Sequence, residues 1–213
     1  MPRVSDEHLA ARRQQILEAA RRCFLRNGFH ATSMQDVIAE AGLSVGAVYR
    51  YFKSKHEIVS EIAEQTTGGL NAALTQIAHH QPPYSLDESM ERVLEIIDSQ
   101  TGPDGMYRMA LQVWAETVRD AAVAEMIAGK YRTIRETFVL IARQARDAGE
   151  LPPDADTEAV GAVLFGLIPG YALQRVLIGE PDRRTYLAGV RTLLVAGRPA
   201  EPTGQPPTRR LTP

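Results

Sequence analysis

Four signals that end or begin helices, all within the first 44 residues, constrain how this chain can fold. Gly28 ends a helix with regularly spaced apolar residues, because glycine readily adopts the left-handed conformation of a helix C-terminus. Ser33, followed by Asp36, approximates a capping box that begins a second helix. Gly42 ends that helix, and Ser44 can cap the next one. The sequence therefore predicts three short helices, with a tight turn between the second and the third.

Helical signals continue through most of the remaining chain. Ser54 with Glu57, and Ser85 with Glu88, form S-x-x-E sequences that begin further helices. Proline- and glycine-rich breaks then separate the later helices, at residues 81–84, 102–105 and 151–153. Two last helices are predicted over about 156–178 and 183–196. Because no strand-like alternation stands out, the chain is predicted to be all-α with about nine helices.

Charge and composition narrow the class of protein. The chain has 213 residues and a net charge of −2, but residues 1–60 carry nine basic and six acidic side chains, a local excess of +3. A basic N-terminal end on an acidic body is compatible with a polyanionic partner. The single cysteine excludes an internal disulfide and a cysteine-based zinc cluster.

The sequence contains no segment that is apolar and long enough to predict membrane insertion. The N-terminus lacks the apolar segment of a secretory signal, and the most apolar uncharged run, residues 159–174, is shorter than the roughly 20 residues that span a bilayer. We therefore expect a cytoplasmic protein with no membrane partner.

The tight turn at residues 41–44 is typical of a helix-turn-helix, whose second member enters the DNA major groove. Helical spacing places one set of apolar residues toward the support of this motif: Val37, Ile38, Ala41, Val48 and Phe52. A second set is left for the outer arc: Val45, Ala47, Tyr49, Arg50, Tyr51 and Lys53.

This region resembles the DNA-binding domain of TetR-family transcriptional regulators. The stretch SMQDVIAEAGLSVGAVYRYFKSKHEI, residues 33–58, is similar to the family's Ala-Gly-Leu-Ser turn, G-x-Φ-Y-x-Y-F core and lysine-rich continuation, and RRQQILEAARRCFLRNGFHATSM resembles its first helix. The resemblance implies a DNA-binding domain over residues 1–58, with the helix-turn-helix at about 33–52. It also implies a helical ligand-binding and dimerisation domain over 59–197. Composition predicts a disordered tail over 198–213.

The same resemblance implies which residues contact DNA. The full set is Thr32, Ser33, Gln35, Ser44, Val45, Gly46, Ala47, Tyr49, Arg50, Tyr51, Lys53 and Lys55. Tyr49 and Tyr51 stand where the family contacts phosphate, and Lys55 stands where it often places a backbone contact. Arg50 is the one residue of the recognition helix able to contact guanine with two hydrogen bonds, but it could equally bind phosphate.

The resemblance further implies a homodimer on a palindromic DNA operator, formed through residues about 157–197. Candidate contacts are Val163, Leu164, Leu167, Tyr171, Leu187, Val190, Leu193 and Leu194, with Gly161, Ala162 and Gly166 permitting close approach. The alternative is that these residues pack within one subunit.

The middle helices would then hold a small-molecule effector. Candidate lining residues are Met90, Tyr107, Leu111, Trp114, Glu116, Phe138, Phe165 and Gln174, which would suit an aromatic or amphipathic molecule. Glu116 could favour a cationic ligand. The alternative is that these side chains form ordinary core.

The sequence-based hypothesis is a repressor that an effector releases from its operator, with an activator of the same fold as the alternative. A helical enzyme and an adaptor without DNA binding are the other two possibilities. The phosphate-loop, H-E-x-x-H and G-x-S-x-G motifs are absent, so no catalytic residue, metal site or cofactor is predicted.

Overall fold

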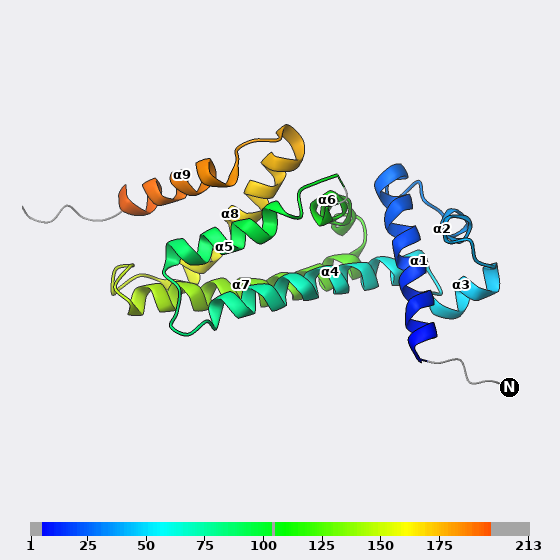
Figure 1. The fold of residues 1–213 in the computed structure, drawn as a ribbon, viewed down its shortest axis with the longest axis horizontal. Coiled ribbons are helices and arrows are strands. Elements are labelled where there is room, and N and C mark those ends of the chain that lie inside the picture. The colour runs from blue at the N-terminus through cyan, green and yellow to red at the C-terminus, as the bar shows by residue number, and fades with distance from the viewer. Residues whose placement is uncertain (1–5, 104, 197–213) are drawn as a thin grey trace, which may run out of the picture.

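The computed structural model describes residues 6–103 and 105–196, and this part of the chain is an all-helical assembly without a strand. Figure 1 shows an elongated molecule with a small helical lobe at one end and a larger bundle beside it. Nine helices follow one another: α1 (Asp6–Asn27), α2 (Met34–Ala41), α3 (Val45–Tyr51), α4 (Lys55–Ala78), α5 (Leu86–Asp98), α6 (Met106–Thr117), α7 (Ala121–Asp147), α8 (Thr157–Ile178) and α9 (Arg183–Ala196). The predicted tail, 198–213, lies outside the described residues.

The small lobe consists of α1, α2 and α3, and α4 leaves it to run along the bundle beside α7 (Figure 1). All five side chains predicted to support the helix-turn-helix are buried: Val37, Ile38, Ala41, Val48 and Phe52. Gly42 adopts a left-handed conformation with φ of 65° and ends α2, as predicted. Hydrophobic spacing and one glycine thus determine how α3 is held.

The helix caps follow the sequence in two cases and depart from it in one. Ser33 with Asp36 and Ser85 with Glu88 form complete capping boxes, as predicted. At α4 the box is only half formed: the Ser54 hydroxyl accepts from the Glu57 N–H, but the Glu57 carboxylate accepts from the Lys53 N–H at 2.6 Å. The carboxylate therefore helps to fix the link between α3 and α4.

The bundle packs α5, α7 and α8 around a core that includes Met90, Phe138 and Tyr171, and α9 lies against α5. Gly161 of α8 faces α7 so closely that an added Cβ would come within 2.8 Å of the Val139 backbone. The expectation that Gly161 permits approach of a second subunit is therefore wrong, because its contact lies within the subunit.

The outer side of α8 remains apolar and uncovered. In the described residues, α8 is the one helix that is long and apolar enough to cross a membrane by length and composition, and 28% of its most apolar window is buried. Val163, Leu177 and Ile178 each keep more than 60% of their surface exposed. Within the described residues, no other helix covers this apolar side of α8.

Candidate DNA interface and effector cavity

The helix-turn-helix presents one face of α3 to solvent. Ser44 caps this helix by accepting a hydrogen bond from the Ala47 N–H at 3.3 Å. Val48 and Phe52 lie beneath it with 0% and 1% exposure, which fixes its rotation about its axis. Because helical geometry then turns the intervening residues outward, Val45, Tyr49 and Arg50 are exposed.

The exposed face of α3 combines a slim leading edge with cationic and aromatic groups. An added Cβ on Gly46 would meet no atom within 4 Å, so the protein's own packing does not require glycine there. Arg50 is exposed, and Lys53 at the end of the helix is exposed and donates to the Tyr49 carbonyl at 2.6 Å. Since α3 contains no acidic residue, this face carries net positive charge.

Two of the predicted DNA-binding side chains point inward, which corrects their assignment. Thr32 is 1% exposed, and its hydroxyl donates to the Gly28 carbonyl at 2.8 Å. The Lys55 ammonium donates to the carbonyls of Phe29 and Thr32 at 2.7 and 2.9 Å, and it lies over the Phe29 ring. Burial lowers the pKa of Lys55. Both side chains hold the loop between α1 and α2 rather than facing DNA.

Ser33 and Gln35, at the start of α2, are exposed, so they remain candidates for contact with DNA. The Ser33 hydroxyl already donates to the Asp36 carboxylate at 2.7 Å, so its proton is not free for a phosphate. Hydrogen bonds from the Ser33 backbone and side chain hold the pKa of Asp36 below its usual range. Tyr51 and Ala47 are half-buried at the edge of the interface.

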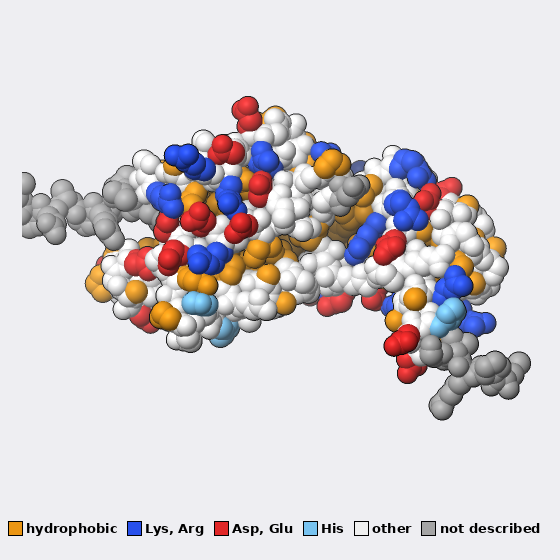
Figure 2. All heavy atoms as spheres, in the orientation of Figure 1, with side chains coloured by type: hydrophobic (Ala, Val, Ile, Leu, Met, Phe, Trp, Pro, Cys, Tyr) orange, Lys and Arg blue, Asp and Glu red, His pale blue; other side chains and the backbone are white. Residues whose placement is uncertain are grey.

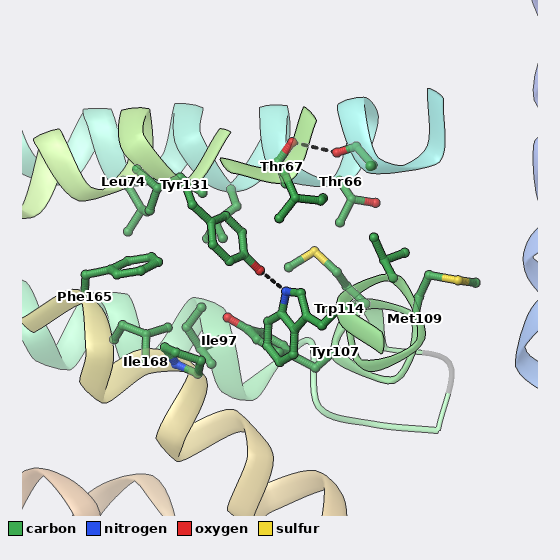
Figure 3. A pocket seen from close by; sticks show the side chains of 18 of the residues that line it. Thr66, Thr67, Leu74, Ile97, Tyr107, Met109, Trp114, Tyr131, Phe165 and Ile168 are labelled. Carbon is green, nitrogen blue, oxygen red and sulfur yellow. Dashed lines mark hydrogen bonds between the residues drawn. The ribbon is translucent and has the colours of Figure 1, made fainter. Parts of the chain in front are cut away.

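A cavity of about 80 Å³ lies inside the bundle between α4, α5, α6, α7 and α8. Four of the eight predicted side chains line it: Tyr107, Trp114, Phe138 and Phe165. Figure 3 shows Trp114 and Tyr131 pointing toward each other across this space, where the indole N–H donates to the phenol oxygen. Burial raises the pKa of Tyr131 to about 12, so its hydroxyl is neutral and can serve as a hydrogen-bonding group.

The other four predicted side chains lie outside the cavity. Met90 is fully buried elsewhere in the core, Leu111 is half-buried, and Gln174 is exposed on α8. Glu116 is buried and pairs with His30, 2.8 Å away, so it is not available to a cationic ligand. These four assignments are corrected.

Sequence reasoning missed the cavity residues that α4 contributes and, apart from Phe138, those that α7 contributes. They include Ile62, Thr66, Thr67, Ile127, Tyr131 and Ile134. The two threonines in an otherwise apolar stripe of α4 were the available signal, because polar residues on a buried helix face often line a cavity.

The cavity and the DNA-binding lobe share one apolar core. Val113 of α6 and Ile127 of α7 line the cavity, and both belong to the cluster that buries α1, α2 and α3. Gln112 adds a hydrogen bond from its amide to the Phe24 carbonyl of α1 at 2.9 Å. A change in the packing of α6 therefore reaches α1 directly.

Comparison with known proteins agrees with this geometry. Residues 16–62 match the family described as bacterial regulatory proteins, tetR family, and residues 87–197 match the C-terminal region of BetI-type transcriptional repressors. The chain belongs to the TetR family. Members of the TetR family are transcriptional regulators rather than enzymes. The chain is also 30% identical over 183 residues to the HTH-type transcriptional regulator UidR of Escherichia coli strain K12, covering 85% of this chain and 90% of UidR.

Solved TetR-like structures share the fold along most of the chain. A transcriptional regulator from Saccharomonospora viridis in complex with choline has a TM-score of 0.72 at 21% identity, over 88% of this chain and 97% of that chain. FadR from Bacillus subtilis in complex with stearoyl-CoA also has a TM-score of 0.72, at 19% identity, over 87% of this chain and 98% of that chain. At this identity the likeness shows the fold alone.

The inward position of Lys55 makes a prediction that separates it from its neighbour Lys53. Lys55→Met should lower the free energy of unfolding by about 1–2 kcal/mol, because two carbonyls lose a charged donor at a partly exposed site. Lys53→Met should leave stability within about 0.5 kcal/mol of the original, because Lys53 is a surface residue, and should weaken DNA binding.

Urea denaturation followed by circular dichroism gives the first quantity, and fluorescence anisotropy with labelled DNA gives the second. Equal stability of the two variants would contradict the structural role of Lys55.

Proposed function

We propose that this TetR-family regulator is a cytoplasmic repressor that binds a palindromic operator as a homodimer and releases it when a small molecule fills the cavity. The observation that carries the proposal is the exposed face of α3. That face is capped, positively charged and slim at its leading edge, and two buried side chains hold it in place.

DNA contact divides between the two ends of α3. Val45, Gly46 and Ala47 carry no side-chain donor, so they offer close approach and apolar contact with thymine methyl groups. Tyr49, Tyr51 and Lys53 lie toward the other end, where hydroxyl and ammonium groups suit the phosphates at the edges of the groove. Arg50 can bind guanine or phosphate, and its role decides how much sequence α3 reads.

The effector site is the apolar cavity beneath α6. Its aromatic wall, formed by Tyr107, Trp114, Tyr131 and Phe165, supports binding of an aromatic or amphipathic molecule. The two fold neighbours crystallised with small molecules hold choline in one case and stearoyl-CoA in the other. The fold is therefore compatible with ligands of either charge. The side chains that line this chain's cavity determine which ligand it binds.

Dimerisation through the outer side of α8 supplies the two-fold symmetry that a palindrome needs. Ala162, Val163, Gly166, Leu173 and Leu177 are all exposed on this helix. Leu193 of α9 is 73% exposed and extends the same kind of surface.

Leu187 and Val190 of α9, expected to contact a second subunit, are instead 3% and 6% exposed within the subunit. That expectation is corrected, because both side chains turn toward the subunit's own core. Leu164 and Tyr171 are likewise buried within the subunit, and Leu167 is half-buried. The side chain of Leu194 lies outside the described part.

The direct test is binding to the promoter of the chain's own gene. The protein should retard this DNA and lose affinity steeply as salt rises, because phosphate contacts release counterions. Tyr49→Phe should weaken binding about equally on all DNA sequences if its hydroxyl contacts phosphate. Arg50→Ala should cost about 1–3 kcal/mol and relax specificity at one base pair if it contacts guanine.

Electrophoretic mobility shift with the operator and with scrambled DNA measures both effects. Arg132→Ala, on the exposed surface of α7, is the matched control and should bind as the original protein does. Unchanged operator affinity in both α3 variants would refute the proposed interface.

The dimer surface makes a second prediction. Val163→Glu should convert the dimer to a monomer, because it places a charge at the centre of an apolar face that is buried between subunits. Val118→Glu is the matched control, because Val118 is 87% exposed and lies after α6, away from α8. Analytical ultracentrifugation reads the mass directly, and a dimeric Val163→Glu protein would place the interface elsewhere.

A further inference from the structure

A wide cleft of about 780 Å³ lies between α1 of the DNA-binding lobe and the bundle helices α4, α5 and α6. Figure 2 shows hydrophobic side chains in the hollow between the small lobe and the bundle, with basic side chains along the small lobe's side of it. One wall of the cleft is therefore α1, which packs in the same lobe as the DNA-reading helix α3.

The cleft and the inner cavity are neighbours separated only by side chains. Five residues line both spaces: Ile62, Thr66, Leu70, Met106 and Met109. The two methionines belong to α6, and their unbranched thioether side chains adapt their shape at low cost. Movement of these side chains would join the narrow cavity to the wide cleft, which makes the cleft the entrance.

The two spaces differ in charge. Among the residues that the structure describes, none with a charged side chain lines the inner cavity. The cleft contains Glu18, Arg21 and Arg22, and the two arginines differ in their partners. Arg22 pairs with Glu40 at 2.8 Å. Within the described part of the chain, the one hydrogen bond of the Arg21 side chain is a neutral one, to the Gln65 amide oxygen at 3.2 Å.

Glu18 does not neutralise the cleft by itself. Its carboxylate accepts a hydrogen bond from the Gln14 amide at 3.2 Å, and no ion pair joins it to Arg21 among the residues that the structure describes. The Arg21 residue is half-buried, but its hydrogen bond to Gln65 is exposed to solvent, so the guanidinium still has donors to offer a ligand. Arg21 could therefore bind an anionic group placed at the mouth of the cavity.

We propose that the effector is an organic anion with a slender apolar tail, whose tail enters the inner cavity beside Trp114 and whose carboxylate binds Arg21 in the cleft. This inference rests on the proposed function and names the chemistry of its effector. It replaces the cationic ligand expected from Glu116, which is already paired with His30.

Such a ligand would couple binding to DNA release. Arg21 belongs to α1, which packs against α2 and α4, while the tail would contact α6 and α7. A bound anion therefore joins the lobe to the bundle through new contacts, and the Arg21–Gln65 hydrogen bond is exchanged for a stronger charged one. The ligand then favours whichever position of the lobe makes both contacts best.

Three probes of equal chain length and different charge test the proposal: decanoate, decan-1-ol and decylamine. Trp114 is the chain's single tryptophan and lines the cavity, so its fluorescence reports entry of the tail. Decanoate should bind with a Kd about tenfold lower than that of decan-1-ol, and decylamine should bind more weakly than either.

Variants assign this preference to Arg21. Arg21→Gln should remove the advantage of decanoate and leave the Kd of decan-1-ol unchanged, and Arg21→Lys should restore part of it. Arg26→Gln is the matched control, because Arg26 lies on the same helix but pairs with Glu40 and is not part of the cleft. Circular dichroism checks that each variant is folded.

The outcomes separate this inference from the proposed function. Equal affinity for the three probes, tighter binding of decylamine, absence of a Trp114 response, or an Arg21→Gln protein that prefers decanoate as before would each overturn the organic-anion assignment. Decanoate that binds through Arg21 yet leaves the operator affinity unchanged would uphold the assignment and contradict release by this ligand.

Discussion

The packing of α6 and α7 against the DNA-binding lobe is the interaction on which the rest of this structure depends. Val113, Val123 and Ile127 belong to the same buried cluster as Phe24, Val48 and the other side chains that hold α1 and α3. Because protein interiors are close-packed, an atom cannot enter this region without displacing neighbours. The cavity and the DNA-reading helix therefore cannot adjust independently.

The polar contacts across the same boundary act mainly on orientation. His30–Glu116 and His56–Asp120 each measure 2.8 Å, but both histidines are more than half exposed. Each pair keeps one partner in solvent, although Glu116 itself is buried, and solvent exposure limits what such a pair contributes to stability. The buried apolar side chains supply the larger part of the free energy that holds the lobe against the bundle. The hydrogen bond from Gln112 to the Phe24 carbonyl fixes the register of α6 on α1.

Local signals account for what could be predicted from the sequence. The two complete capping boxes, the left-handed Gly42 and the inward spacing of Val48 and Phe52 depend on residues close together in the chain, and the structure confirms them. Lys55 and Glu116 are misassigned because their partners are carbonyls or side chains brought close only by folding. Thr32 is misassigned because its burial depends on tertiary packing, although its Gly28 partner is only four residues away. Gly161 and Gly166, both expected at the dimer interface, also show that local sequence does not identify a residue's tertiary neighbour.

Gly161 and Gly166 look alike in sequence, yet only Gly161 faces another helix within the subunit. Only four of the eight side chains predicted to line the cavity do so, for a related reason. Aromatic residues at helical spacing identify a buried face, and four of them line the cavity. Helical spacing does not say which helix lies opposite, so Tyr131 of α7 and Thr66 of α4 were missed.

We infer that filling the cavity releases the operator by changing the separation of the two DNA-binding lobes in a dimer. Spin labels on Leu9→Cys measure this separation, because Leu9 of α1 is 37% exposed and is not among the proposed DNA contacts, whereas Cys23 is fully buried and burial raises the pKa of its thiol. On operator DNA the labels should report one narrow distance that fits major grooves about 34–36 Å apart. Decanoate at a concentration that saturates the Trp114 signal should shift that distance, and an unchanged distribution would contradict the account.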